Sequence, residues 1–349
     1  MAAILDLPLE WVLGALFLAG AALGGQLNRG MYRLAWNARP IGPWSPPADG
    51  APPRRWYDRI PVLGWCFLSR ESPLHGRGYW VRPLVIELGT GLGLAALYWH
   101  EVVRSGALPG GTRLSPAALH AQYLSHVVLI ALLTVATFID FDEQTIPDAI
   151  TLPGTLAGLL LAAALPMSRP VVAGWTVFPA VGVTARHLHL ASPAAWPASC
   201  NGLRGLAIAL ACYVAWWFAV IPWTWTTRRG LRAALVFLAA SLVRRVSPLL
   251  LAMLVAGALA ILGVWLGGGE AWQSLLSSLV GLAFGGGLIW AVRVVGTRAL
   301  GQEAMGFGDV TLMAMIGAFT GWQGALIVFF LAPFAAVLVS LTQCLVTGR

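Results

Sequence analysis

Carboxylates gather at two places in this 349-residue sequence. The first is the segment from Asp140 to Asp148, which also contains Asp142 and Glu143. The second is a Gly-Phe-Gly-Asp segment that ends at Asp309. Two carboxylates that share one proton can divide acid–base work, one acting as a base toward water and the other as an acid toward a carbonyl group. The sequence therefore holds the residue types that an aspartic hydrolase needs.

Each cluster also has an ordinary structural interpretation. Gly306 and Gly308 would let the backbone turn and leave room for an extended substrate beside Asp309. Asp309 could equally cap the helix that follows it, and Asp148, directly after Pro147, could cap another. Taken separately, Asp148 and Asp309 are each better explained as helix caps than as catalytic residues. A shared location on one membrane face is what favours catalysis.

Composition places these carboxylates in a membrane protein. Hydrophobic residues make up 58% of the chain and charged residues 10%, whereas a soluble domain carries about 25% charged residues. Lipid must therefore cover much of the surface. Apolar runs near the spanning length fall at 11–28, 83–103, 121–139, 149–167, 204–226, 248–268 and 272–296, and a longer run at 310–343 is interrupted at Gly321. The sequence predicts an all-α polytopic membrane protein with about nine transmembrane helices.

The arginines predict the orientation of these spans. All 22 basic residues are arginine, with nine in the 29–82 segment, five in 227–247, and Arg293 and Arg298 in the segment before the last apolar run. By the positive-inside rule these segments face the cytoplasm. The N-terminus is then outside, and alternation of the spans brings Asp140 and Asp309 to the cytoplasmic side. This clustering explains the +8 net charge better than a nucleic-acid partner does.

Three segments outside the spans are each predicted to form a different kind of structure. Residues 40–82 are rich in Pro, Arg and Trp, which predicts a small, mostly irregular cytoplasmic loop subdomain. Residues 168–203 are interpreted as an external loop, in which His187 and His189 lack a third metal ligand and count as ordinary loop residues. Leucines at steps of four, three and four within 228–245 predict an amphipathic helix in the cytoplasmic interface.

Two segments together resemble the signatures of the type IV prepilin peptidases, a family of GxGD-type aspartic peptidases. The first runs from Asp140 to Pro153, and the second is GFGDVTLMAMIGAFTGW at 306–322. The segments 25–34, 59–65 and 82–87 resemble parts of the family's N-terminal region. The resemblance covers residues 1–165 and 270–349. It implies a region at 1–110 like the family's N-terminal part, and a peptidase membrane domain at 111–349 with an insertion at 168–269.

The resemblance implies that Asp140 and Asp309 are the catalytic pair. Asp140 is favoured over Asp142 because it precedes Asp148 by the family's spacing. The supporting or substrate-facing residues are then Asp142, Glu143, Asp148, Gly306, Gly308 and Glu87. The family's substrates are prepilins of type IV pili and pseudopilins of type II secretion, which carry a basic leader before a hydrophobic helix. Cleavage is expected at the cytoplasmic face of the inner membrane, where acidic residues beside Asp140 could attract the leader.

Cofactor use differs from that of many family members. Many carry two CxxC pairs in the first cytoplasmic loop, but this loop holds only Cys66, so no zinc site is expected. The other cysteines are scattered, at Cys200, Cys212 and Cys344. Many members also N-methylate the new N-terminus with S-adenosylmethionine. The sequence leaves open whether this chain methylates its product and binds S-adenosylmethionine. The peptidase reaction itself needs no cofactor.

Two other classes of protein compete with the peptidase interpretation. A transporter would place acids near the membrane midplane and show related halves, whereas these acids lie at one edge and the halves show no symmetry. A noncatalytic scaffold with the same fold would tolerate loss of either aspartate, and both are present. The sequence therefore favours the peptidase. The insertion adds an even number of spans, which preserves the sidedness of Asp309, and its role in partner docking or lipid packing is open.

Overall fold

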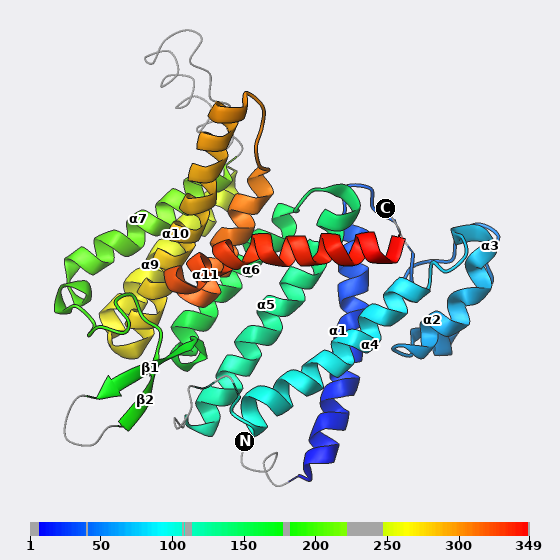
Figure 1. The fold of residues 1–349 in the computed structure, drawn as a ribbon, viewed down its shortest axis with the longest axis horizontal. Coiled ribbons are helices and arrows are strands. Elements are labelled where there is room, and N and C mark those ends of the chain that lie inside the picture. Colours follow the sequence, from blue (N-terminus) through cyan, green and yellow to red (C-terminus); the bar gives the residue numbers. More distant parts are fainter. Residues whose placement is uncertain are drawn as a thin grey trace. The chain divides into compact units, whose positions relative to one another are not determined.

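The computed structural model describes residues 7–39, 41–106, 108, 114–176, 182–221 and 247–347. Within these residues the regular secondary structure is helical apart from one two-stranded hairpin (Figure 1). The long helices are α1 (Leu9–Leu34), α4 (Val81–Tyr98), α5 (Pro116–Glu143), α6 (Asp148–Ala164), α7 (Leu203–Val220), α9 (Pro248–Gly267), α10 (Gly269–Leu300) and α11 (Phe307–Thr347). Lipid offers backbone groups no hydrogen bonds, so apolar spans satisfy them internally as helices. The prediction of an all-α polytopic membrane protein is confirmed.

Seven of the described helices are long and apolar enough to cross a membrane. The eighth long helix, α6, has 17 residues and is shorter. As the sequence predicts, α11 is interrupted at Gly321, whose φ of 81° and ψ of 176° are not helical. Glycine adopts this positive φ without the steric cost that a side chain brings. The expected total of nine is reached by counting α6 as a span and the two parts of α11 separately.

Shorter elements connect these helices. They are α2 (Leu63–Leu68), α3 (Ser72–His75), 3₁₀ turns at Trp56–Arg59, Ser69–Glu71, Pro166–Ser168 and Ala198–Asn201, a π-helical turn at Trp99–Val103, and strands β1 (Val171–Thr176) and β2 (Gly182–His187). The loop subdomain is thus more helical than expected. The 168–203 segment, expected as a loop, contains the hairpin, whose first strand begins with two β-branched valines. The amphipathic helix predicted at 228–245 lies outside the described residues.

The chain forms two compact units. The first comprises residues up to Thr151 together with 173–185, and the second comprises 152–172 and the chain from Arg186 onward. In the first unit α1 packs closely on α4. A methyl group added at Gly20 would stand 2.8 Å from the Cα of Gly91, a separation that only small residues permit. Helix α5 completes this three-helix group.

The second unit is centred on α10 and α11. A side chain added at Gly281 or at Gly317 would overlap the carbonyl oxygen of the other residue, so the two backbones are in direct contact. Around them lies a buried core shared with α7 and α9. Its fully buried members include Tyr213, Trp272, Leu276, Leu279 and Leu282. Helix α9 begins at a Ser-Pro pair, in which the Ser247 hydroxyl accepts a hydrogen bond from the N–H of Leu250 and caps the helix.

Candidate active site

Asp140 lies in the last turn of α5 and is exposed. The helix ends at Glu143 because Gln144 takes a left-handed conformation, with φ 53°, and donates its N–H to the Asp140 carbonyl oxygen at 2.7 Å. Helix α6 starts with Asp148, which is also exposed. The carboxylate of Asp148 thus stands in the first turn, where the helix dipole favours negative charge. The segment from Asp140 to Asp148 is a short helix–turn–helix connection.

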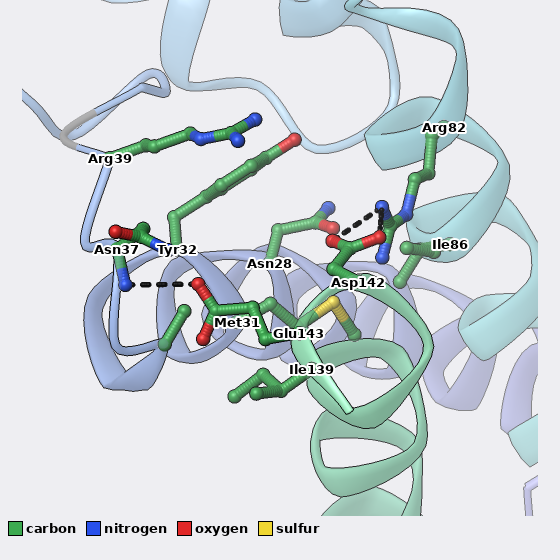
Figure 2. Close-up of a pocket in the computed structure, with 11 residues that line it drawn as sticks. Asn28, Met31, Tyr32, Asn37, Arg39, Arg82, Ile86, Ile139, Asp142 and Glu143 are labelled. Carbon is green, nitrogen blue, oxygen red and sulfur yellow. Dashed lines mark hydrogen bonds and ion pairs between the residues drawn. The ribbon is translucent and has the colours of Figure 1, made fainter. Parts of the chain in front are cut away.

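Asp142 and Glu143 brace α5 against its neighbours in the first unit (Figure 2). Both carboxylate oxygens of Asp142 lie 2.8 Å from Nη1 of Arg82, at the start of α4. The Glu143 carboxylate accepts hydrogen bonds from the backbone N–H groups of Trp36, at 2.7 Å, and Asn37, at 2.9 Å. Both acids therefore have partners within the chain, and they hold the end of α5 to α4 and to the segment that follows α1.

Glu87 is a buried anchor in the first unit. Its side chain is 3% exposed, and its carboxylate accepts hydrogen bonds from the Trp65 indole at 2.7 Å, the Val62 N–H at 2.5 Å and the Asn28 amide at 3.4 Å. These donors come from α2, from the residue before it and from α1. Glu87 thus joins two spans to the loop subdomain, and these contacts are internal.

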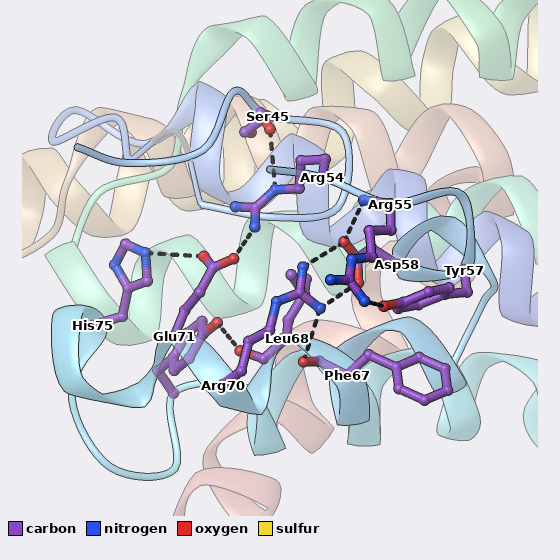
Figure 3. Close-up of polar contacts among 11 residues, drawn as sticks. Ser45, Arg54, Arg55, Tyr57, Asp58, Phe67, Leu68, Arg70, Glu71 and His75 are labelled. Carbon is purple, nitrogen blue, oxygen red and sulfur yellow. Dashed lines mark hydrogen bonds and ion pairs between the residues drawn. The ribbon is translucent and has the colours of Figure 1, made fainter. Parts of the chain in front are cut away.

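The loop subdomain is fixed by two ion pairs (Figure 3). Asp58, which is fully buried, receives two hydrogen bonds from Arg70, at 2.6 and 2.7 Å, and one from the backbone N–H of Arg55 at 2.7 Å. Arg70 holds the pKa of the Asp58 carboxyl below its ordinary value. The buried carboxylate of Glu71 pairs with Arg54. These charges order a segment that the sequence suggested was mostly irregular.

The second carboxylate cluster opens α11. Asp309 is half-buried in the first turn of that helix, and a methyl group added at Gly306 would lie 3.6 Å from its Oδ2. The carboxylate therefore turns back toward Gly306. Neither Gly306 nor Gly308 is among the described residues with positive φ. A Cβ at Gly306 would make only an ordinary contact with the carboxylate, so neither this spacing nor a positive φ requires glycine at that position.

Arg293 organises the approach to Asp309, a role that the sequence analysis missed. From α10, its Nε donates to the Met305 carbonyl oxygen at 2.9 Å, and its Nη2 pairs with Glu303 at 2.6 Å. Its guanidinium also lies 5.7 Å from the centre of the Phe307 ring. Arg293 thus contacts both the loop before α11 and Phe307, the first residue of that helix. The available signal was an arginine near the end of a span, which the sequence analysis used only for topology.

The two expected catalytic residues belong to different compact units, Asp140 to the first and Asp309 to the second. His187 ends β2 and His189 follows it, and both make structural contacts. The Nδ1 of His187 is 3.3 Å from the Arg169 carbonyl oxygen, and the His189 carbonyl oxygen accepts a hydrogen bond from Gln323 at 2.9 Å. Across the described ranges, no group of three or more His, Cys, Asp or Glu side chains is arranged to hold a metal ion.

Comparison with known proteins links the chain to one family. Residues 243–341, which contain Asp309, match the type IV leader peptidase family. Three relatives carry the name prepilin leader peptidase/N-methyltransferase. The protein of Klebsiella pneumoniae is 34% identical over 167 residues, covering 45% of this chain and 66% of the relative. That of Myxococcus xanthus is 32% identical over 152 residues, covering 44% of this chain and 41% of the relative.

The relative from Pseudomonas aeruginosa is 37% identical over 114 residues, covering 33% of this chain and 38% of the relative. The chain thus matches less than two thirds of the length of each of these three proteins. No solved structure matches the chain. The family match and the three relatives agree with one another, and residues 243–341 carry the type IV leader peptidase domain.

Proposed function

We propose that the chain is an aspartic endopeptidase of the inner membrane that removes the leader of prepilins or pseudopilins. The observation that carries this proposal is the place of the two aspartates: Asp140 lies in the last turn of one apolar helix and Asp309 in the first turn of another. If α6, α7, α9 and α10, the long helices between the two aspartates, each cross the membrane once, an even number of crossings gives both aspartates the same sidedness. The arginine-rich segments make that side the cytoplasm.

The proposed reaction uses the two carboxylates as a unit that shares one proton. The ionised member removes a proton from water, and the resulting hydroxide attacks the scissile carbonyl carbon. The protonated member hydrogen-bonds to the carbonyl oxygen, and a proton then passes to the departing amine as the C–N bond breaks. A site at the membrane edge suits a substrate whose leader is in water while its helix stays in lipid.

The acids beside Asp140 offer electrostatic attraction to a basic leader. Arg82 offsets the charge of Asp142, whereas the backbone N–H groups that hold Glu143 carry no net charge. Replacing Glu143 by Gln should therefore slow processing of a basic leader more than Asp142→Asn does. Unchanged processing after both replacements would contradict this part of the proposal.

Methylation of the new N-terminus is the second proposed activity. Its motivation is the printed name of the three relatives. S-adenosylmethionine would supply a methyl group to the amine that cleavage exposes.

We further propose that 1–110 and 111–349 are the functional divisions of the chain and that 168–269 is an insertion between the two aspartate motifs.

Co-expression with a prepilin tests the peptidase. Wild type should convert the substrate to a shorter mature form, and Asp140→Asn and Asp309→Asn should each abolish the conversion while inserting normally into the membrane. Asp49→Asn is the matched control, because Asp49 is an exposed aspartate of the loop subdomain outside the proposed site. Normal cleavage by Asp140→Asn or Asp309→Asn would favour a noncatalytic or transport role.

A further inference from the structure

A polar pocket lies within the first compact unit, where α1, α4 and α5 end or begin (Figure 2). Its volume is about 90 Å³. The polar side chains that line it are Asn28, Tyr32, Asn37, Arg82, Asp142 and Glu143, with Arg39 at the rim. Of the residues that line it, only Asp142 and Glu143 have a role in the cleavage proposed above, where they attract the leader.

Asn28 contributes a buried acceptor to the pocket. The residue is 2% exposed, and its Nδ2 donates to the Pro83 carbonyl oxygen at 2.9 Å and to Glu87 at 3.4 Å. Both partners are acceptors, so the amide cannot be reversed without placing oxygen against oxygen. Its Oδ1 is buried and has no hydrogen-bond partner within the described residues. A buried acceptor left in this way is costly, and a ligand that donates an N–H would relieve the cost.

The charges of the pocket favour a ligand that carries both signs. Asp142 is balanced by Arg82, while Glu143 adds negative charge near the orphan acceptor. At the rim, Arg39 forms no ion pair within 4 Å in the described part of the chain. A simple anion would meet the carboxylates, and a simple cation would meet the arginines. A zwitterion can place its ammonium toward Asn28 and its anionic group toward Arg39.

We propose that this pocket binds the amino-acid head of S-adenosylmethionine. Asn28 Oδ1 accepts from the α-ammonium group, and Arg39, with the hydroxyl of Tyr32, binds the α-carboxylate. The small volume of the pocket suits the head alone. This inference rests on the methylation part of the proposed function and is independent of cleavage. The ammonium and phosphate of a phosphatidylethanolamine headgroup have a similar charge pattern, so the test separates the two sources.

The experiment measures binding of S-adenosylhomocysteine to the purified full-length protein by isothermal titration calorimetry. Its matched ligand is 5′-methylthioadenosine, which lacks the amino-acid head. Arg39→Gln should weaken S-adenosylhomocysteine about tenfold, the effect of losing one charge-assisted contact, and leave 5′-methylthioadenosine unchanged. Arg77→Gln, the same replacement at an exposed arginine outside the pocket, should change neither. Asn28→Ala, if it folds, should also weaken S-adenosylhomocysteine binding and leave 5′-methylthioadenosine binding unchanged. If Asn28→Ala does not fold, the result for Arg39→Gln alone tests the proposal.

Three results would overturn the proposal. If wild type binds S-adenosylhomocysteine and Arg39→Gln binds it equally well, the ligand occupies another site. If wild type in phosphatidylglycerol nanodiscs does not bind S-adenosylhomocysteine but binds added phosphatidylethanolamine, and Arg39→Gln does not, the pocket holds a lipid headgroup. If wild type binds neither ligand, methylation fails together with this site. Cleavage of a prepilin by the same wild-type sample reports separately on the peptidase, so the two failures can be distinguished.

Discussion

The Trp65 indole donates a hydrogen bond to the buried carboxylate of Glu87 at 2.7 Å. This contact ties the loop subdomain to α4, and the Val62 N–H and the Asn28 amide reach the same carboxylate. A carboxylate can accept all three hydrogen bonds at once. Glu87 is thus the point at which α1, α4 and the loop subdomain are fastened together.

Glu87→Ala should lower the free energy of unfolding by about 3 kcal/mol, because it leaves buried donors without an acceptor. Glu87→Gln, which keeps one acceptor oxygen, should cost less. The measurement is the midpoint of thermal unfolding in detergent, followed by tryptophan fluorescence. Glu10→Ala, at an exposed position of α1, controls for the loss of a charged side chain. A Glu87→Ala midpoint equal to that control would show that the three contacts contribute no stability.

The loop subdomain should lose stability in acid. Because Arg70 depresses the pKa of Asp58 below its ordinary value of 3.8 in the folded state, the unfolded chain takes up a proton first as the pH falls. The stabilisation by this pair is therefore complete above about pH 4 and declines as the pH falls toward the folded-state pKa. Limited proteolysis of the loop subdomain between pH 3 and 7 would follow this change.

Asp58→Asn should make the loop subdomain more susceptible at neutral pH and should flatten this acid dependence. Asp49→Asn removes an exposed carboxylate of the same segment and should leave the wild-type profile intact. An Asp58→Asn profile that parallels the wild-type profile would assign the acid sensitivity to other groups.

The contact between α10 and α11 should not tolerate a methyl group. Gly281→Ala places its Cβ against the Gly317 carbonyl oxygen, so the helices must separate, at a cost of about 1–3 kcal/mol. Gly287→Ala is a matched control in the same helix, because nothing lies within 4 Å of the added atom. Alanine is the better helix former, so the control should be neutral or stabilising in thermal unfolding. Equal midpoints for the two variants would refute the close packing.

The sequence predicted the long helices well because lipid leaves an apolar span few alternatives. The interruption at Gly321 was also visible, since the run was too long for one span. The hairpin was missed because the strands are short and lie among prolines. The pairing of Asp58 with Arg70 was equally hidden, because nothing in the sequence says which of nine nearby arginines a given carboxylate will meet. Glu87 was singled out by resemblance alone, and its anchoring role needed the structure.

Some features of the candidate site could likewise be predicted from the sequence, and others could not. The sequence singled out Asp140 and Asp309 as the expected catalytic pair through their motifs and through the ends of apolar runs, and those two features are local. It missed the way Arg293 holds the loop before Asp309, and it did not foresee that Arg82 would offset Asp142. Such contacts join separate helices, so they depend on packing that periodicity and composition do not report.

The central claim is that Asp140 and Asp309 act as one catalytic unit. Its most direct test is the single-turnover rate of prepilin cleavage by wild type, Asp140→Asn, Asp309→Asn and the double variant, all in matched detergent. Residues that act as a unit lose nearly everything when either is removed. The double variant should therefore be no slower than either single variant. Substantial cleavage by a single variant, or losses that multiply in the double variant, would contradict a shared-proton pair.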